Sequence, residues 1–458
     1  MPALPSFVLL TALGIGCPPE ETLVPVVPPT PGSGAYRVGR IRFEGNTRTC
    51  DRLLRDRVVL DEGDILNTRE LELSLRAIAG LGFVRLAGPV ELTASEAGPH
   101  HVDVTVKVEE RTRPGVSAGG TLGGIEGGSL EGSFSTPNLF GCGERVELAL
   151  QGGDRVQRYA AAFEKPYLFG GPWTGGLGAE RRSLEVEGSR ERDLPAYDVD
   201  RSAAWIEAAA PLGPLARVSA RYSFAAIRSE PGTALDDDEP PAGRFGRRHE
   251  SELSVAAERD TAGGCWEPRR GTRLRASLSL AGGPLGGDVR LVESRAEAVA
   301  YLPHLSRTTF AARLQVAGLF AFGESAADET PFDRLYALGG PGELRGYQPR
   351  EVGPRDAAGR VAGGRRLLLA NAEYAAVVAS RLSVVAFLDA GHVFGGGAPE
   401  PALRDRGARW HAAAGAELRL RLPLVEVPLR LIWAVRLPPA GVQGGSEPSL
   451  ALGTTFGP

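Results

Sequence analysis

From Arg113 to Phe456 the sequence is made of short runs in which apolar and polar residues alternate, separated by Gly, Pro and Asp. A period of two places successive side chains on opposite faces of a β-strand, so each run predicts a strand with one apolar and one polar face. The clearest run sets Leu429, Leu431, Trp433, Val435 and Leu437 opposite Arg430 and Arg436. A soluble sandwich buries such apolar faces between two sheets, whereas a membrane barrel turns them toward lipid and keeps its polar faces inside.

The number and spacing of these runs favour the membrane barrel over the soluble sandwich. We count about sixteen runs, and bacterial single-chain barrels have an even number of strands. The connections alternate between short turns, such as NLFGCGE and PHLSR, and longer polar loops, such as SEPGTALDDDEPPAGRFG. Short periplasmic turns and longer outer loops are the asymmetry expected of such barrels. We therefore predict that residues 111–458 form an all-β membrane barrel of about 16 antiparallel strands.

Composition and cysteine spacing exclude several other classes of protein. The net charge is −4, and the chain is rich in Gly and Pro without a collagen period, which disfavours a nucleic-acid partner and a disordered chain. Cys50, Cys142 and Cys265 show no metal-ligand spacing, so we expect no metal site and no cofactor, and the sequence leaves their disulfide state open. We find no catalytic constellation in the chain, and we expect that it is not an enzyme.

The N-terminal residues predict export. Residues 1–17 contain an apolar run from Phe7 to Ile15, which has the length of a signal-peptide core and is too short to span a bilayer as a helix. Ile15-Gly16-Cys17 is similar to a bacterial lipoprotein cleavage site, which makes Cys17 a candidate for lipidation. Residues 18–35 are Pro-rich and lack periodicity, as expected of an extended linker.

Residues 36–110 predict a small α+β domain in the order strand, helix, helix, strand, strand. The first strand, in RVGRIRFEGN, ends at a Gly-Asn turn, and Thr49 is placed to cap a short helix that runs to about Arg57. Val84–Leu92 predicts a weaker strand. From His101, four valines alternate with polar residues, which predicts a half-buried strand.

The second helix of this domain has the strongest local signals. Asn67 is its expected N-cap, with Glu70 three residues on, and Gly82 is its expected stop. One helical face carries Leu71, Leu75 and Ile78.

The residues LGGPGELRGY, Leu338–Tyr347, combine a Gly-rich turn with a single Arg, and they lie in a polar segment, residues 323–364, between two alternating runs. Loops longer than about 15 residues inside an ordered architecture are usually functional or disordered. The segment is too polar for us to expect apolar packing, so we predict that a charged anchor, Arg345, holds it. A solvated turn with an incidental Arg is the alternative. The glycines that permit the turn geometry are Gly339, Gly340 and Gly342.

Six segments follow one another along the chain: PNLFGCGE from residue 137, KPYLFGG from 165, ERDTAGGCWEPRRGTRL from 258, LGGPGELRGY from 338, NAEY from 371 and FLDAGHVF from 387. In order and spacing they resemble the BamA/TamA superfamily of outer-membrane assembly and translocation barrels. The element order of residues 36–110 resembles a POTRA domain, the periplasmic module that precedes these barrels. The resemblance implies a barrel in the bacterial outer membrane with a POTRA domain in the periplasm.

The resemblance also implies where the central loop lies. The loop that carries Arg345-Gly346-Tyr347 is expected to fold back into the barrel lumen, where Arg345 meets Asp389 of FLDAG. Glu373 of NAEY is a second candidate acid, and Gly391 is a further motif glycine.

Strand parity supports this placement independently. An inward direction is favoured for a carboxylate because a charge that faces lipid at mid-depth costs several kcal/mol. Asp389 lies on the opposite side of its strand from an unbroken apolar face, so it is predicted to point inward. Asn371 and Glu373 likewise lie opposite the apolar residues of their own strand and are predicted to point inward. The apolar face opposite Asp389 is Leu382, Val384, Ala386, Leu388 and Ala390. An ordinary lumenal carboxylate is the alternative for Asp389.

The first barrel strand, GVSAGGTLGG, is depleted in side chains, and glycines weaken a strand interior. We expect its residues Gly119, Gly120 and Thr121 to pair poorly with the last strand, which ends at Phe456. By the resemblance, such a weak lateral seam is a gate for client strands.

By the same resemblance, the function is insertion, assembly or translocation of polypeptides at the outer membrane. The implied partners are the outer-membrane lipid bilayer, unfolded client polypeptides and a periplasmic protein that binds the POTRA domain. Two alternatives stay open: a two-partner secretion transporter for one dedicated substrate, and a passive porin-like channel in which the loop is a plug.

Overall fold

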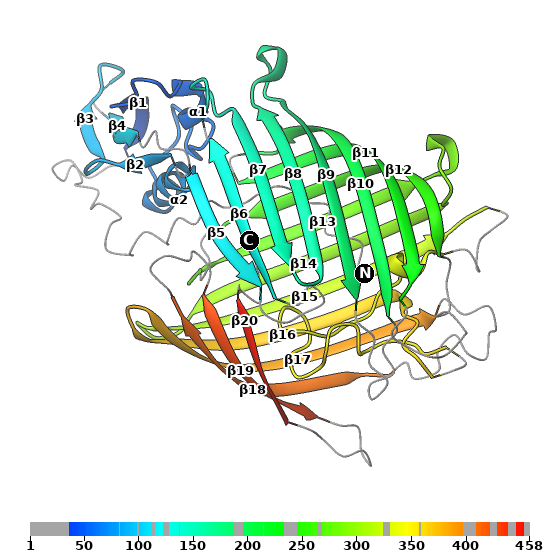
Figure 1. Ribbon diagram of the computed structural model, residues 1–458. Coiled ribbons are helices and arrows are strands. Elements are labelled where there is room, and N and C mark those ends of the chain that lie inside the picture. Colours follow the sequence, from blue (N-terminus) through cyan, green and yellow to red (C-terminus); the bar gives the residue numbers. More distant parts are fainter. Residues whose placement is uncertain are drawn as a thin grey trace.

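The computed structural model describes residues 36–81, 83–98, 100–110, 115–121, 128–136, 138–186, 196–213, 215–232, 245–262, 268–323, 330–356, 359–396, 409–421, 428–437 and 446–452. Within these ranges the chain forms a small N-terminal domain and one large sheet that curls around an interior (Figure 1). The predicted signal peptide, the linker, Cys17, Cys265 and Phe456 lie outside the described residues. No helix in the described ranges is long and apolar enough to cross a membrane.

The N-terminal domain is built around its last strand. Its elements are β1 (Arg37–Glu44), α1 (Asp51–Arg55), α2 (Thr68–Ala79), β2 (Val84–Leu86), β3 (Glu91–Ala94) and β4 (His101–Glu110). β4 pairs in parallel with β1, and it pairs antiparallel with β2 and β3. The predicted strand at Val84–Leu92 is divided here into β2 and β3, so the sheet has four strands. Gly88-Pro89 separates them, because Gly weakens a strand interior and Pro has no N–H to donate to a ladder.

The first helix differs from its prediction. α1 begins after Cys50 and ends at Arg55, and no side chain caps it. The Thr49 hydroxyl, predicted to be the cap, instead accepts a hydrogen bond at 2.9 Å from Nδ2 of Asn138, which lies after Ser129–Thr136 and before Arg145–Gly153, two strands of the large sheet. The residue expected to start a helix therefore contributes to the contact between the two domains.

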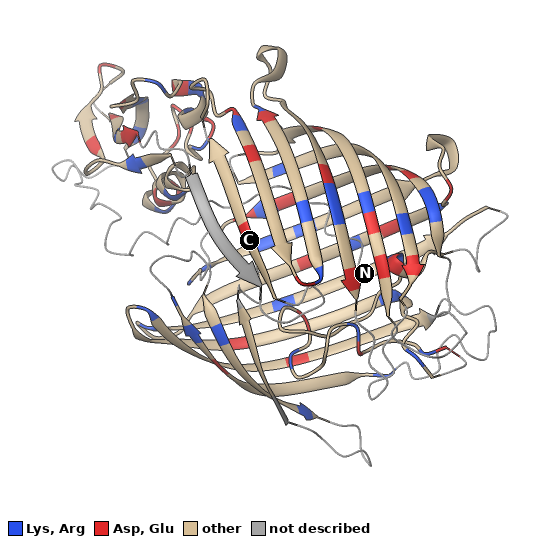
Figure 2. Cartoon of the chain, viewed as in Figure 1, with Lys and Arg blue, Asp and Glu red and all other residues tan. Residues whose placement is uncertain are grey.

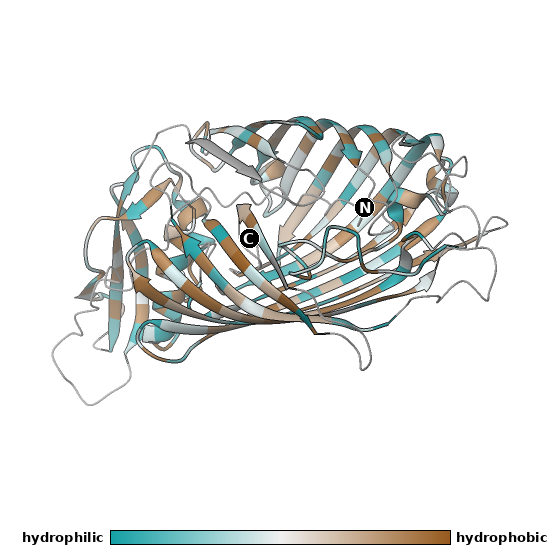
Figure 3. Cartoon of the chain, turned by 60° about the horizontal axis from the view of Figure 1, so that its bottom comes forward, coloured by the Kyte–Doolittle hydropathy of each residue, from teal (hydrophilic) through white to brown (hydrophobic). Residues whose placement is uncertain are grey.

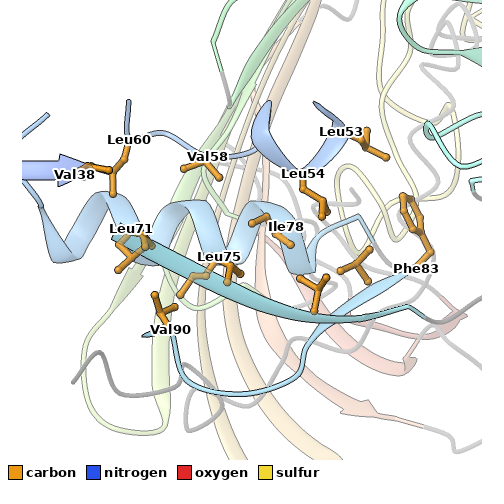
Figure 4. Packing of buried hydrophobic residues seen from close by; sticks show 14 residues of the cluster. Val38, Leu53, Leu54, Val58, Leu60, Leu71, Leu75, Ile78, Phe83 and Val90 are labelled. Carbon is orange, nitrogen blue, oxygen red and sulfur yellow. The ribbon is translucent and has the colours of Figure 1, made fainter. Parts of the chain in front are cut away.

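The second helix forms as its signals indicate. Asn67 accepts a hydrogen bond at 3.0 Å from the backbone N–H of Arg69, and α2 ends at Ala79 with Gly80 as C-cap. This end lies ahead of the predicted stop, Gly82, which is not among the described residues. The apolar face of α2 packs between β4 and the α1 segment (Figure 4). The buried side chains of this core include Leu54, Leu60, Leu71, Leu75, Ile78, Phe83 and Val104.

The large sheet confirms the predicted barrel architecture. In the part of the chain that the structure describes it has sixteen strands, and each pairs antiparallel with the next along the chain. They are β5 (Gly115–Thr121), β6 (Ser129–Thr136), β7 (Arg145–Gly153), β8 (Val156–Lys165), β9 (Thr174–Val186), β10 (Tyr197–Pro211), β11 (Ala216–Pro231), β12 (Gly246–Asp260), β13 (Gly271–Ala281), β14 (Leu291–Pro303), β15 (Thr308–Ala321), β16 (Gly364–Ala379), β17 (Leu382–Gly396), β18 (His411–Leu420), β19 (Leu429–Leu437) and β20 (Ser446–Leu452). Among the described residues, short 3₁₀ turns lie at Leu168–Gly170, Gly283–Leu285 and Phe332–Arg334.

The register of the barrel turns many large apolar residues of the strands outward. On β19, Leu431 and Trp433 are 51% and 63% exposed, whereas Arg430 is 1% exposed. Hydropathy alternates along the strands (Figure 3), and Lys, Arg, Asp and Glu recur along them (Figure 2). Asp389, Asn371 and Glu373 are buried on the inner face, as parity predicts. The outer face is therefore suited to lipid and the inner face to polar contacts.

β5 and β20 are the end strands of the sheet, and we call their junction the seam. The two strands lie close to each other. Ladders of paired residues join every consecutive pair from β5 to β20, but among the described residues none joins β5 to β20 directly. β5 contains Gly119, Gly120 and Thr121.

Candidate functional site

The loop between β15 and β16 folds back on itself inside the barrel (yellow in Figure 1). Its backbone pairs with itself, since Leu338 N–H donates to the Val352 carbonyl at 2.8 Å and Val352 N–H returns the bond at 2.9 Å. A further pair joins Tyr336 to Gly364, the first residue of β16. Residues 323–364, predicted to form a long polar loop, are thus compact and ordered in the parts that the structure describes.

Two glycines of the motif are required by a positive φ and by close contacts that leave no room for a Cβ. Gly339 has φ of +140°, and a Cβ there would lie 1.9 Å from the carbonyl oxygen of Gln348. Gly346 has φ of +84°, and a Cβ there would lie 2.9 Å from the Cβ of Ala434 on β19. The loop consequently approaches the barrel wall closely at the residue that follows Arg345.

The remaining motif glycines differ among themselves. Gly340 has φ of +94°, whereas Gly342 has open space around its Cα and an ordinary φ. On β17, a Cβ at Gly391 would lie 2.5 Å from Cδ1 of Leu338, so this position receives the loop.

Arg345 lies at the centre of the site and is 1% exposed. Its Nε and Nη2 donate to the two carboxylate oxygens of Asp389, each at 2.7 Å, and its backbone N–H donates to Oδ2 at 3.2 Å. Nη1 donates to Glu373 at 2.7 Å and to Glu417 at 3.0 Å. The guanidinium also stacks on Phe387, 3.6 Å from the ring centroid. One side chain of the loop therefore joins β16, β17 and β18.

Two further arginines complete the group, which we call the Arg345 cluster. Arg419 donates to Glu417 at 2.6 Å and to both oxygens of Glu373 at 2.9 and 2.8 Å. Arg430 on β19 donates to the two oxygens of Glu417 at 2.6 and 2.7 Å. Three arginines thus face three carboxylates, and the formal charges balance. Buried charges of this kind are tolerated when they are paired and their hydrogen bonds are satisfied.

Asn371 positions the acid that receives Arg345. Its Nδ2 donates to Oδ1 of Asp389 at 2.8 Å and to the carbonyl of Glu343 at 2.7 Å. Its Oδ1 accepts a hydrogen bond at 2.9 Å from Nε of Arg313, which also donates to the Gly342 carbonyl at 2.8 Å. The amide therefore links the barrel wall to the turn just ahead of Arg345.

Tyr347 and Arg436 fix the other side of the turn. The Tyr347 hydroxyl donates to the Ala412 carbonyl at 3.3 Å, and the Arg436 guanidinium lies 4.5 Å from the centroid of the Tyr347 ring. Arg436 donates to the Gly346 carbonyl at 2.6 Å and pairs with Glu351 at 2.7 Å. The whole Arg-Gly-Tyr motif is thus bound to strands of the wall.

Sequence reasoning placed Arg345, Asp389 and Glu373 in the lumen but missed Glu417, Arg419 and Arg430. Many inward positions of these strands are charged, and parity alone does not show which of these residues contact Arg345. The strand register supplies what parity lacks: Arg419 and Arg430 are direct cross-strand partners in the hairpin of β18 and β19. Like charges placed opposite each other are destabilising, so this pair requires a nearby carboxylate, which is Glu417.

The expectation that the loop is too polar for apolar packing is wrong. Four loop side chains are buried in one apolar cluster with the barrel wall: Tyr336, Leu338, Leu344 and Val352. The wall contributes Leu291, Leu319, Leu367, Leu369 and Val393. The inner face is therefore apolar at this place. The continuous apolar run Leu367–Ala370 is the sequence signal for it, because such a run is apolar on both faces.

A second attachment point, which we call the Phe332 turn, holds the start of the described loop. Phe332 packs against Tyr197 of β10 with ring centroids 5.0 Å apart. Asp333 accepts a hydrogen bond at 2.5 Å from Arg248 of β12, and Arg334 donates to Glu252 of the same strand at 2.5 Å. The loop is thus attached at two separate places in the lumen.

A model of the Omp85 superfamily domain matches residues 138–456, and a POTRA model described as a surface antigen variable number repeat matches residues 36–111. The human sorting and assembly machinery component 50 homolog is 27% identical over 342 residues, which is 69% of this chain and 66% of the relative. The outer membrane protein assembly factor BamA of Nitratidesulfovibrio vulgaris is 26% identical over 368 residues, 77% of this chain and 43% of the relative.

The chain therefore spans less than two thirds of the length of these relatives. Among solved structures, BamA from Haemophilus ducreyi lacking POTRA domains 1–3 has a TM-score of 0.61 at 20% identity, covering 91% of this chain and 83% of that one. That likeness supports the fold.

Removing either partner of the central ion pair should destabilise the barrel. Arg345→Ala leaves Asp389 buried without its bidentate donor, and breaking a buried ion pair costs about 3 to 5 kcal/mol. We expect Arg345→Ala and Asp389→Ala each to lower the free energy of unfolding, and the double variant to lose clearly less than the sum. Arg345→Lys should restore little, because an ammonium cannot make the paired contacts. Guanidinium unfolding in detergent measures all four. Additivity within about 0.5 kcal/mol would contradict the coupling.

Release of the loop should require the loss of both attachment points. Arg345→Ala leaves the Phe332 turn in place, and Asp333→Ala leaves the Arg345 cluster in place. We therefore expect trypsin to cut at Arg350 or Arg355 only in the double variant, because the paired loop is protected in each single variant. Retained heat-modifiable migration on gels controls for barrel folding. Cutting in Arg345→Ala alone would show that the second attachment does not hold the loop.

Proposed function

Because the chain belongs to the Omp85 superfamily, with its barrel in the bacterial outer membrane and its POTRA domain in the periplasm, we propose that it inserts client β-barrel polypeptides into that membrane. The observation that supports this most is the seam, where β5 and β20 are adjacent without a described ladder. The same seam is also compatible with export of a dedicated substrate. The cross-linking experiment below distinguishes insertion of client barrels from such export.

The proposed mechanism follows from the solvation of the backbone. An N–H or C=O group without a partner costs several kcal/mol in hydrocarbon, so an end strand of a barrel without a ladder favours pairing with another strand. A client strand that pairs with β5 satisfies these groups and presents its own free edge to the next strand. The sequence of β5 includes Gly119 and Gly120, and because glycines weaken a strand interior, this strand is suited to the exchange.

The POTRA domain is proposed to deliver clients by strand addition. The outer edge of β1 is partly occupied, since Val38 N–H donates to the Asp64 carbonyl and Gly63 N–H donates to the Val38 carbonyl, both at 2.8 Å. The opposite edge, formed by β2 and β3, is then the surface where an extended peptide can add through main-chain hydrogen bonds.

A proline in β3 tests this delivery step. Ser95 N–H bonds the His101 carbonyl, so the antiparallel alternation turns the N–H of Ala94 away from β4. Ala94→Pro removes that outward donor, and we expect a labelled peptide with the sequence of residues 429–437 to bind roughly two- to tenfold more weakly in fluorescence anisotropy. Ala94→Thr keeps the N–H and is the matched control. Equal affinities for both variants would mean that the POTRA domain does not use this edge.

Closing the seam covalently tests the proposed function. Cysteines at Thr121 and Ser449, in a chain whose native cysteines are serine, join β5 to β20 when oxidised. We expect the cross-linked protein in liposomes to stop producing protease-resistant client barrels and to resume after reduction, because client strands then lose access to β5.

Three further outcomes separate the alternatives. Normal client assembly by fully cross-linked protein would exclude insertion through the seam. Export of a soluble polypeptide by the cross-linked protein would favour a secretion transporter. Solute efflux that rises only in the Arg345→Ala, Asp333→Ala double variant would favour a channel plugged by the loop. The Thr121→Cys single variant controls for the substitution itself.

A further inference from the structure

The POTRA domain lies directly on the turn between β6 and β7. The backbone N–H of Cys50 donates to the Gly141 carbonyl at 2.9 Å, and the Arg48 guanidinium donates to the Leu139 carbonyl. On the neighbouring turn, between β8 and β9, Arg52 of α1 donates to the Gly170 carbonyl at 2.9 Å. The domain is thus seated on two periplasmic turns of the barrel.

The contact at Gly141 is closer than a side chain would permit. Gly141 has φ of +107°, and a Cβ there would lie 2.4 Å from the Arg48 carbonyl oxygen. Gly143 is also confined, since a Cβ there would lie 3.2 Å from both Cδ atoms of Leu53 on α1. The residue between these two glycines is Cys142.

The POTRA side of this contact is held rigidly. The Glu110 carboxylate, at the end of β4, accepts hydrogen bonds from the backbone N–H of Arg48 at 3.0 Å and of Thr49 at 2.5 Å. The Thr47 hydroxyl donates to the same carboxylate at 2.9 Å. Cys50 follows directly and packs against the POTRA core. Its position relative to Gly141 is therefore set by the fold of the domain.

Cys50 and Cys142 are both free thiols of intermediate exposure. The backbone hydrogen bond from Cys50 to Gly141, the residue just before Cys142, places the two cysteines next to each other across the domain contact. We propose that these two cysteines form a disulfide that joins the POTRA domain to the barrel in the periplasm. Neither the predicted function nor the lumenal site uses these residues.

The reaction is a thiol–disulfide exchange with a protein disulfide of the periplasm as oxidant. One cysteine thiolate attacks a sulfur of the oxidant, which breaks the oxidant's S–S bond and forms a mixed disulfide. The second cysteine thiolate then attacks the first cysteine's sulfur in this mixed disulfide and expels the oxidant's thiolate. The two cysteines lose two protons and two electrons, one S–S bond forms between Cys50 and Cys142, and the oxidant is released as a dithiol. The periplasm is an oxidising compartment in which such bonds form and persist.

The environment favours a lasting bond over a labile one. Burial, together with the neighbouring Cys50 thiol, raises the pKa of the Cys142 thiol to about 11. Disulfides become strong oxidants when the reduced form is stabilised as a low-pKa thiolate, and Cys142 lacks that stabilisation. The raised pKa also leaves little Cys142 thiolate to react. We therefore expect the bond to be formed by a protein disulfide oxidant of the periplasm rather than by air oxidation.

Peptide mapping of the native protein tests the proposal. Outer membranes are prepared with free thiols blocked by iodoacetamide, and the protein is digested with trypsin without reduction. We expect the peptide of residues 49–52 to be joined to the peptide of residues 112–145, in most of the molecules, and to separate on reduction. The oxidised chain should also migrate faster than the reduced chain on a denaturing gel.

Single variants provide the matched controls. Cys50→Ser and Cys142→Ser should each abolish the joined peptide and the mobility difference, and each should leave the other cysteine alkylated. The proposal is overturned if both peptides are recovered mainly as alkylated free cysteines. It is equally overturned if Cys50 or Cys142 is joined to Cys17, to Cys265 or to a second molecule.

Discussion

The solvation of the backbone in a hydrocarbon layer is the constraint on which the rest of this structure depends. Every N–H and C=O group inside the bilayer must find a partner within the protein, and a sheet meets this demand only by pairing each strand with two neighbours. Fourteen of the sixteen barrel strands, β6 to β19, have both ladders among the described residues. The two end strands are the place where the demand is met least, and the proposed function uses this deficit.

Inside the barrel a different constraint applies. The loop between β15 and β16 has no hydrophobic core of its own, so contacts with the barrel wall must hold it in place. The wall supplies both kinds of contact at once. The charge-balanced Arg345 cluster fixes the Arg-Gly-Tyr turn, and the apolar patch around Leu338 and Leu344 removes loop side chains from water. Neither contact alone accounts for the order of the loop, since the Phe332 turn adds a separate attachment.

Much of the fold was predictable from the sequence because lipid and lumen impose opposite preferences on alternate residues. This preference fixes the direction of Asp389, Asn371 and Glu373 without any knowledge of their partners. It does not say which inward charges meet, and for this reason Glu417 and its two arginines were missed. The contacts depend on strand register and on the path of the loop, and both are tertiary properties. Local signals likewise placed Asn67 at a helix start, whereas Thr49 was drawn into an interdomain contact that no local pattern contains.

The two attachment points of the loop lie on different parts of the wall. The Phe332 turn binds β10 and β12, and the Arg345 cluster binds β16 to β19. The loop segment between these two attachment points therefore connects two parts of the barrel wall and resists a change in the distance between them. The cylinder is therefore stiffened across β10 to β19, and elastic deformation is directed toward the strands that border the seam.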